Sequence, residues 1–227
     1  MEDVALNLAA VHARIEQAAE RAGRDPGGIR LLAVSKTQPA EVLLEAWEAG
    51  QRDFGENYLQ EALPKLDALA NHAACWHFIG GLQSNKTRAV AERFDWLHTL
   101  DRVSIAKRLS EQRPEPLPPL HICLQVNVSG EGSKGGVAPE RLPELVEAVT
   151  ALPRLKLRGL MAIPEPARGE AAQRVPFRRM RELMRQLNEA GHSLDTLSMG
   201  MSEDLEAAIL EGATVVRVGT AIFGARV

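Results

Sequence analysis

A lysine ends the first apolar run of the sequence, residues 31–36, which reads LLAVSK. Side chains of a strand alternate between its two faces, so Leu32, Val34 and Lys36 share one face. If the first two fill a core, Lys36 points toward the interior where the strand ends. Burial disfavours the ammonium form of a lysine, and a neutral amine can attack an aldehyde to form a Schiff base. The alternative is a solvated lysine that simply ends a strand.

Small and hydroxylated residues nearer the C-terminus have the types that bind phosphate. Gly219 leaves backbone N–H groups accessible, and the hydroxyl of Thr220 adds a donor. Gly200 and Ser202 have the same character, and Ser202 is also expected to cap the helix that follows it. A Schiff-base lysine facing such a group predicts pyridoxal phosphate (PLP) or the phosphosugar substrate of an aldolase.

Short apolar runs alternate with helical patterns along the chain. Eight strands are predicted at residues 31–35, 53–55, 76–79, 96–99, 121–126, 158–163, 196–199 and 215–218. An amphipathic helix at residues 4–22 precedes the first strand, and the last long helix is expected to start behind Pro176. This order predicts an α/β fold: a single (β/α)8 barrel of the TIM type with an extra N-terminal helix, with residues 1–227 forming one domain. A doubly wound open sheet is the alternative.

The barrel would bring the candidate residues together. Functional residues of such barrels lie at the C-terminal ends of the strands, and phosphate is bound after strands seven and eight. Lys36 follows the first predicted strand, whereas Ser202 and Thr220 follow the seventh and the eighth. We therefore expect the lysine and the phosphate-binding residues at the same mouth of the barrel.

The composition excludes several classes of protein. In 227 residues, 27 Lys and Arg against 30 Asp and Glu give a net charge of −3. This balance argues against nucleic acid as a partner and against a polybasic membrane anchor. The apolar runs are too short for a transmembrane helix, and the N-terminus has no secretory pattern. Two cysteines, Cys75 and Cys123, fit a reducing compartment, so a cytoplasmic protein is expected.

One short segment contains metal-ligand residue types. His72, Cys75 and His77 lie close together in sequence. No fourth ligand or second cluster completes a site, so no metal is assigned, and Cys75 and His77 are expected to be packing residues of a strand. The phosphate-loop, dinucleotide-binding and serine-hydrolase motifs are also absent from the sequence.

Six segments together resemble one family. They are residues 31–37 (LLAVSKT), 54–58 (FGENY), 77–86 (HFIGGLQSNK), 158–164 (RGLMAIP), 198–202 (SMGMS) and 216–224 (VRVGTAIFG). The chain resembles the pyridoxal phosphate homeostasis proteins, which share their barrel with the N-terminal domain of alanine racemase. The resemblance implies PLP as the cofactor, Lys36 as its Schiff-base residue, Asn57 near the cofactor and Arg217 facing the pyridine nitrogen. It further implies that the phosphate is held by Gly200, Ser202, Gly219 and Thr220.

The same resemblance implies a protein that binds, buffers and delivers PLP, so no catalytic residue is assigned. Arginine keeps its proton at neutral pH, so Arg217 would leave the ring nitrogen unprotonated and the cofactor a weak electron sink. The sequence ends at Val227, without residues for the second domain from which alanine racemase takes a base. A small PLP-dependent racemase or decarboxylase and a Schiff-base aldolase without PLP are the alternatives. The expected partners are PLP and, transiently, PLP enzymes lacking their cofactor, and the chain is expected to be a monomer.

Overall fold

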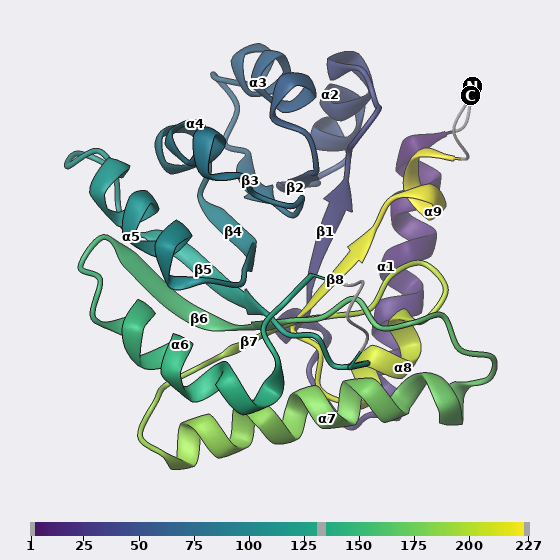
Figure 1. Cartoon of the computed structure of the whole chain (residues 1–227). Helices are drawn as coiled ribbons and strands as arrows, with labels where there is room; N and C mark the ends of the chain where they lie inside the picture. The colour runs from purple at the N-terminus through teal and green to yellow at the C-terminus, as the bar shows by residue number, and fades with distance from the viewer. Residues whose placement is uncertain (1–2, 131–134, 225–227) are drawn as a thin grey trace.

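Eight parallel strands form a closed barrel in this computed structural model, which describes residues 3–130 and 135–224 (Figure 1). Neighbouring strands pair in chain order, and β8 pairs with β1 to close the sheet. The strands are β1 (Arg30–Val34), β2 (Asp53–Glu56), β3 (Cys75–Phe78), β4 (Trp96–Leu100), β5 (Leu120–Gln125), β6 (Leu155–Met161), β7 (Thr196–Ser198) and β8 (Val215–Val218). The predicted barrel is confirmed, and the open sheet is excluded.

Helices surround the barrel on the outside (Figure 1). They are α1 (Val4–Arg21), α2 (Ala40–Glu48), α3 (Leu59–Ala68), α4 (Thr87–Arg93), α5 (Val103–Gln112), α6 (Leu142–Thr150), α7 (Glu170–Glu189), α8 (Leu205–Leu210) and α9 (Thr220–Phe223). Short 3-10 helices also lie at Pro26–Gly28, Ser84–Lys86 and Pro139–Arg141. Within the described part of the chain, no helix combines the length and the apolar character needed to cross a membrane.

The predicted N-terminal helix is confirmed as α1. Asp3 caps it by accepting a hydrogen bond from the backbone N–H of Leu6. Its apolar face is buried and includes Leu8, Val11 and Ile15, and the helix packs beside α8 and α9 (Figure 1). The extra helix therefore covers the elements that follow the seventh and eighth strands.

The last long helix starts earlier than predicted. α7 begins at Glu170, and Pro176 lies inside it. Residues 170–176 contain no buried side chain, so the apolar pattern that marks a helix in the sequence begins only at Phe177. The first turns of α7 were missed because they have no face directed at the core.

The interior of the barrel is partly apolar and partly polar. Two small clusters fill the apolar part: Leu32 with Ile79 and Val215, and Trp96 with Cys123 and Met161. Barrels of this type are usually filled by branched apolar side chains. Here His77, His98 and Ser198 are fully buried and hydrogen-bonded to one another in the same interior.

Candidate functional site

A cavity of about 350 Å³ opens at the C-terminal ends of the strands. Six of the seven predicted site residues line it, and they are Lys36, Asn57, Ser202, Arg217, Gly219 and Thr220. They come from the ends of β1, β2 and β8 and from the segment between β7 and α8. Closure of the barrel thus brings together residues that lie up to 184 positions apart in the sequence, from position 36 to position 220.

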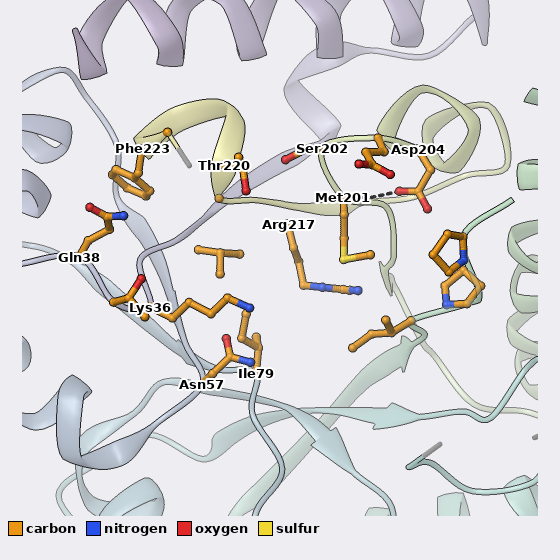
Figure 2. A pocket seen from close by; sticks show the side chains of 18 of the residues that line it. Lys36, Gln38, Asn57, Ile79, Met201, Ser202, Asp204, Arg217, Thr220 and Phe223 are labelled. Carbon is orange, nitrogen blue, oxygen red and sulfur yellow. Dashed lines mark hydrogen bonds between the residues drawn. The ribbon is translucent and has the colours of Figure 1, made fainter. Parts of the chain in front are cut away.

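Lys36 lies two residues beyond the end of β1. Its side chain is partly buried and extends across the cavity toward Asn57 and Ile79 (Figure 2). Val34 lines the same cavity, so the alternation expected for the strand continues to Lys36. The next residue, Thr37, has a φ of 66°, a conformation that is rare for a residue with a branched side chain. The chain therefore turns sharply just after the lysine.

A buried ion pair supports the segment that presents Lys36. The Lys65 Nζ donates to Glu56 Oε1 and to the carbonyl oxygen of Ser35, both at 2.8 Å. The Ser35 hydroxyl donates to the same Oε1 at 2.6 Å. Burial raises the pKa of Glu56, against the hydrogen bonds from Lys65 and Ser35 that lower it. These contacts hold the backbone directly before Lys36.

Arg217 lies buried at the bottom of the cavity. Its Nη1 donates to the carbonyl oxygen and to the hydroxyl of Ser198, at 2.6 and 2.8 Å, and its Nη2 donates to the carbonyl oxygen of Ala162 at 2.9 Å. Burial lowers the pKa of Arg217 to about 10, so the side chain stays a cation at neutral pH. A guanidinium has five N–H groups. Two of them, on Nε and Nη2, have no acceptor among the described residues.

The phosphate-binding candidates lie on the other side of Arg217 from Asn57 (Figure 2). A Cβ on Gly219 would come within 3.1 Å of the carbonyl oxygen of Val34, so glycine permits the end of β8 to approach β1. Arg14 of α1 donates to the carbonyl oxygen of Ser202 at 2.8 Å and pairs with Glu206 at 2.7 Å. The N-terminal helix therefore holds the loop that carries Ser202.

The predicted helix cap at Ser202 is wrong. α8 begins at Leu205, and its cap residue is Asp204. Residues 202–204 form a turn, in which Asp204 Oδ1 accepts a hydrogen bond from the backbone N–H of Met201 at 2.6 Å (Figure 2). The Ser202 side chain is therefore not used by the helix. Burial raises the pKa of Asp204, which also lines the cavity.

Gly200 is buried and does not line the cavity. Its φ is 93°, and a Cβ there would lie 2.5 Å from the Cβ of Ala208. Its carbonyl oxygen accepts the backbone N–H of Arg217 at 2.9 Å. Packing of α8 against the barrel thus accounts for a glycine at this position, and its predicted contact with phosphate stays a prediction.

The three residues with metal-ligand types do not form one cluster. His72 packs edge-on against Trp47, with ring centroids 4.7 Å apart. Cys75 and His77 lie instead in β3, and Asp53 of β2 joins them. None of these three side chains lines the cavity that contains Lys36.

The lining of the cavity suits PLP. The cofactor has an aldehyde, a pyridine nitrogen and a phosphate, and the cavity offers an amine, a guanidinium with free N–H groups and a group of small donors. The amide oxygen of Asn57 is buried and has no hydrogen-bond partner within the described ranges. Such an unpartnered polar atom is costly unless a ligand satisfies it. Ile79 and Phe223 provide apolar contact area.

Comparison with known proteins places the chain in a family. Residues 6–227 match the sequence pattern described as the N-terminal domain of alanine racemase. A pyridoxal phosphate homeostasis protein of Pseudomonas aeruginosa is 65% identical over 226 residues, which cover 100% of this chain and 97% of that protein. This chain belongs to the pyridoxal phosphate homeostasis protein family.

Solved structures agree with this assignment. PipY of Synechococcus elongatus, in its structure with PLP bound, is 37% identical with a TM-score of 0.80, and the match covers 93% of this chain and 100% of PipY. Alanine racemase of Corynebacterium glutamicum has a TM-score of 0.72 at 18% identity, covering 100% of this chain and 62% of the racemase. The second likeness concerns the fold alone. The homeostasis family and the racemase thus share the barrel.

The residues that support the site were not predicted from the sequence of this family member. Lys65, Arg14 and Ser198 act through other residues, and each is separated in sequence from the group that it contacts. Ser198 lies within one of the six segments that resemble the family, and Lys65 lies outside every strand and helix predicted from the sequence. A lysine at an otherwise buried position of a helix was the only available signal, because it implies a buried partner.

Proposed function

We propose that this chain binds PLP through Lys36 and acts in intracellular PLP homeostasis, holding the cofactor and delivering it to enzymes that need it. The observation that carries the proposal is that one cavity contains both the Lys36 amine and the buried Arg217 guanidinium. The name of the Pseudomonas aeruginosa relative and the PLP bound to PipY support it. We infer that residues 1–227 act as a single PLP-binding domain.

The residues of the cavity have distinct roles in this proposal. The Lys36 Nζ would hold the aldehyde carbon of the cofactor as a Schiff base. Arg217 would donate one of its free N–H groups to the ring nitrogen, and the Asn57 side chain would satisfy a polar group of the cofactor from the β2 side. Ser202, Gly219 and Thr220 would donate to the phosphate, where hydrogen bonds to a charged acceptor are strong.

We further propose that the chain does not turn over amino acids. PLP supplies an electron sink to enzymes that break bonds at the α-carbon, and a sink needs a protonated ring nitrogen to be strong. A cationic Arg217 has no proton to give at neutral pH, since burial lowers its pKa only to about 10. Tyr58, the single tyrosine of the sequence, is 55% exposed and does not line the cavity. A small PLP-dependent racemase is the second candidate, because the barrel is shared with alanine racemase.

The cellular setting is also part of the proposal. Two free cysteines, one of them fully buried, suit a reducing compartment, so we place the protein in the cytoplasm. The expected partners are PLP and, transiently, enzymes that lack it. A closed barrel with its helices buries its own core, so a monomer is proposed.

Borohydride reduction tests the attachment to Lys36. The protein is incubated with PLP and reduced, its intact mass is measured, and the modified peptide is mapped. A mass increase of one reduced cofactor on the peptide containing Lys36 is expected, and Lys36→Ala should abolish it. Lys86→Ala serves as the control, because Lys86 lies in the short 3-10 helix Ser84–Lys86 and is exposed. An adduct that maps to Lys86, or that survives in Lys36→Ala, would refute the proposal.

A further inference from the structure

A chain of hydrogen bonds runs through the interior of the barrel from Arg217 to its opposite end. Ser198 Oγ lies 2.8 Å from Arg217 Nη1 and 2.8 Å from His98 Nδ1. His98 Nε2 lies 2.9 Å from His77 Nδ1, and His77 Nε2 lies 2.9 Å from Asp53 Oδ1. The three side chains in the middle of this hydrogen-bond chain, those of Ser198, His98 and His77, are fully buried. The chain joins strands β8, β7, β4, β3 and β2 in that order.

With both imidazoles neutral, the carboxylate end of the hydrogen-bond chain determines the direction of every bond in it. A guanidinium only donates, an ionised carboxylate only accepts, and a neutral imidazole has one donor and one acceptor nitrogen. His77 therefore carries its proton on Nε2 and donates it to Asp53, so its Nδ1 accepts from His98 Nε2. His98 Nδ1 is then an acceptor for the hydroxyl proton of Ser198, whose oxygen accepts from Arg217.

The surroundings favour this arrangement with both imidazoles neutral. Burial lowers the pKa of His77 and lowers that of His98 well below its usual value. Burial raises the pKa of Asp53, but the hydrogen bond from His77 and the charge of Arg30 hold it below its ordinary value. Arg30 lies 3.0 Å from Asp53 Oδ1, and Cys75 Sγ lies 3.4 Å from His77 Nε2.

Further charged and titratable groups face the same interior. Arg158 and Arg30 lie over the ring of Trp96, and His121 stacks on that ring with centroids 4.6 Å apart. Asp95 and Arg217 also act on the histidines electrostatically. Arg217 and Arg30 oppose a positive charge on His98. Asp53 and Asp95 act in the opposite sense on His77, but burial outweighs them and lowers its pKa.

We propose that Ser198, His98 and His77 are positioning residues for Arg217, and that they hold both imidazoles as Nε2–H tautomers in a one-way chain that ends on Asp53. The chain keeps Ser198 Oγ free to accept from Arg217 Nη1. Two N–H groups of the guanidinium then face the cavity rather than turning inward to a buried acceptor. The consequence for a bound PLP rests on the proposed function, whereas the tautomers do not depend on it.

The tautomers are tested on the protein without cofactor. Two-bond proton–nitrogen correlation spectra of protein with ¹⁵N-labelled histidine distinguish Nε2–H, Nδ1–H and doubly protonated rings. His77→Gln and His98→Gln provide the assignments. At pH 7, both residues are expected as neutral Nε2–H tautomers. An Nδ1–H tautomer or an imidazolium at either position would refute the one-way chain.

The effect on Arg217 is tested with PLP. Ser198→Ala and His98→Leu break the chain, so both should bind PLP about tenfold more weakly, which corresponds to loss of one hydrogen bond to a charged group. Both should also shift the absorption maximum of bound PLP, which a purely structural role would leave in place. His98→Asn retains an acceptor near the Nδ1 position and should restore most of the affinity and the original maximum.

His121→Gln is the matched control. His121 is a histidine of β5 that stacks on Trp96 and does not belong to the hydrogen-bond chain. The His121→Gln protein should bind PLP with unchanged affinity and an unchanged absorption spectrum. Unchanged PLP binding and spectrum in both Ser198→Ala and His98→Leu would overturn the positioning role. If the unaltered protein fails to take up PLP, the proposed function is refuted. The tautomer measurement still tests the direction of the hydrogen bonds between Ser198 and Asp53, because it needs no cofactor.

Discussion

Lys65 and Glu56 form a buried ion pair directly behind the cavity, with Nζ and Oε1 2.8 Å apart and side-chain exposures of 7% and 0%. The pair joins α3 to the end of β2, and Ser35 ties it to the segment that follows β1. The second carboxylate oxygen, Oε2, has no partner among the residues that the structure describes. A charged pair that does not line the cavity therefore supports the segment directly before Lys36.

Removing one member of this pair is expected to be costly. Lys65→Met leaves the Glu56 carboxylate buried without its cation, which typically lowers the free energy of unfolding by about 3–5 kcal/mol. Lys65→Met combined with Glu56→Gln should recover part of that loss, because no charge is then left unpaired. Urea unfolding of the three proteins measures the effect. The exposed pair Arg88–Glu92 is the control, since Arg88→Ala should change stability by less than about 0.5 kcal/mol. Equal losses of unfolding free energy in Lys65→Met and Arg88→Ala would contradict the prediction.

Thr220→Val is expected to weaken PLP binding without unfolding the protein. The substitution removes one hydroxyl donor to a charged acceptor, a loss of roughly 1.5–3 kcal/mol, or about tenfold or more in Kd. Thr220 is exposed, so stability without the cofactor should change little. Titration followed by PLP absorbance measures the affinity. Thr150→Val, on the remote helix α6, should bind PLP normally, and normal binding by Thr220→Val as well would remove Thr220 from the site.

Stability is expected to fall as the solution is acidified below about pH 6.5, the pKa of an unfolded histidine. Burial lowers the pKa of His77 and His98, and it lowers that of His121 to about 4. Between pH 4 and 6.5 the unfolded chain therefore binds more protons than the folded one, so the free energy of unfolding rises with pH in this window. Each such histidine adds a slope of up to about 1.4 kcal/mol per pH unit.

Urea unfolding at pH 7.5, 6, 5 and 4.5 measures this dependence. His121→Gln should make the slope shallower, because one of the groups that folding keeps neutral has been removed. His12, on α1, provides the control: His12→Gln should leave the slope close to that of the unaltered protein, since His12 is exposed. A slope that stays the same in His121→Gln would contradict the assignment.

The PLP-loaded protein is expected to exchange the α-proton of amino acids slowly or not at all. General-base assistance typically contributes about 10²–10⁴-fold, and proton loss also needs a strong electron sink. Incubation with L-alanine in deuterium oxide, followed by mass spectrometry and chiral analysis, detects both exchange and racemisation. Deuterium incorporation or D-alanine formation near about 1 s⁻¹, an ordinary enzymatic rate, would favour the racemase instead.

Local patterns in the sequence determined the order of the elements. Apolar runs separated by helical spacing predicted eight strands, and each run overlaps one of β1 to β8. The alternation in LLAVSK also predicted that Lys36 faces the interior, because a strand has a period of two that needs no tertiary information. The errors occurred where the period was absent, as in the first turns of α7.

Only the tertiary structure decided how the site is supported. Lys65 reaches Ser35 across 30 positions, and His98 reaches Ser198 across 100. No spacing rule links such pairs, since they meet only when the sheet closes and the strand registers are set. Closure also separated residues that the sequence had grouped: it buried Gly200 against Ala208 while leaving Ser202 at the cavity. The residue types at the strand ends therefore indicated the chemistry of the site, whereas the charge pairs and hydrogen bonds that hold those residues depend on long-range packing, which local sequence does not encode.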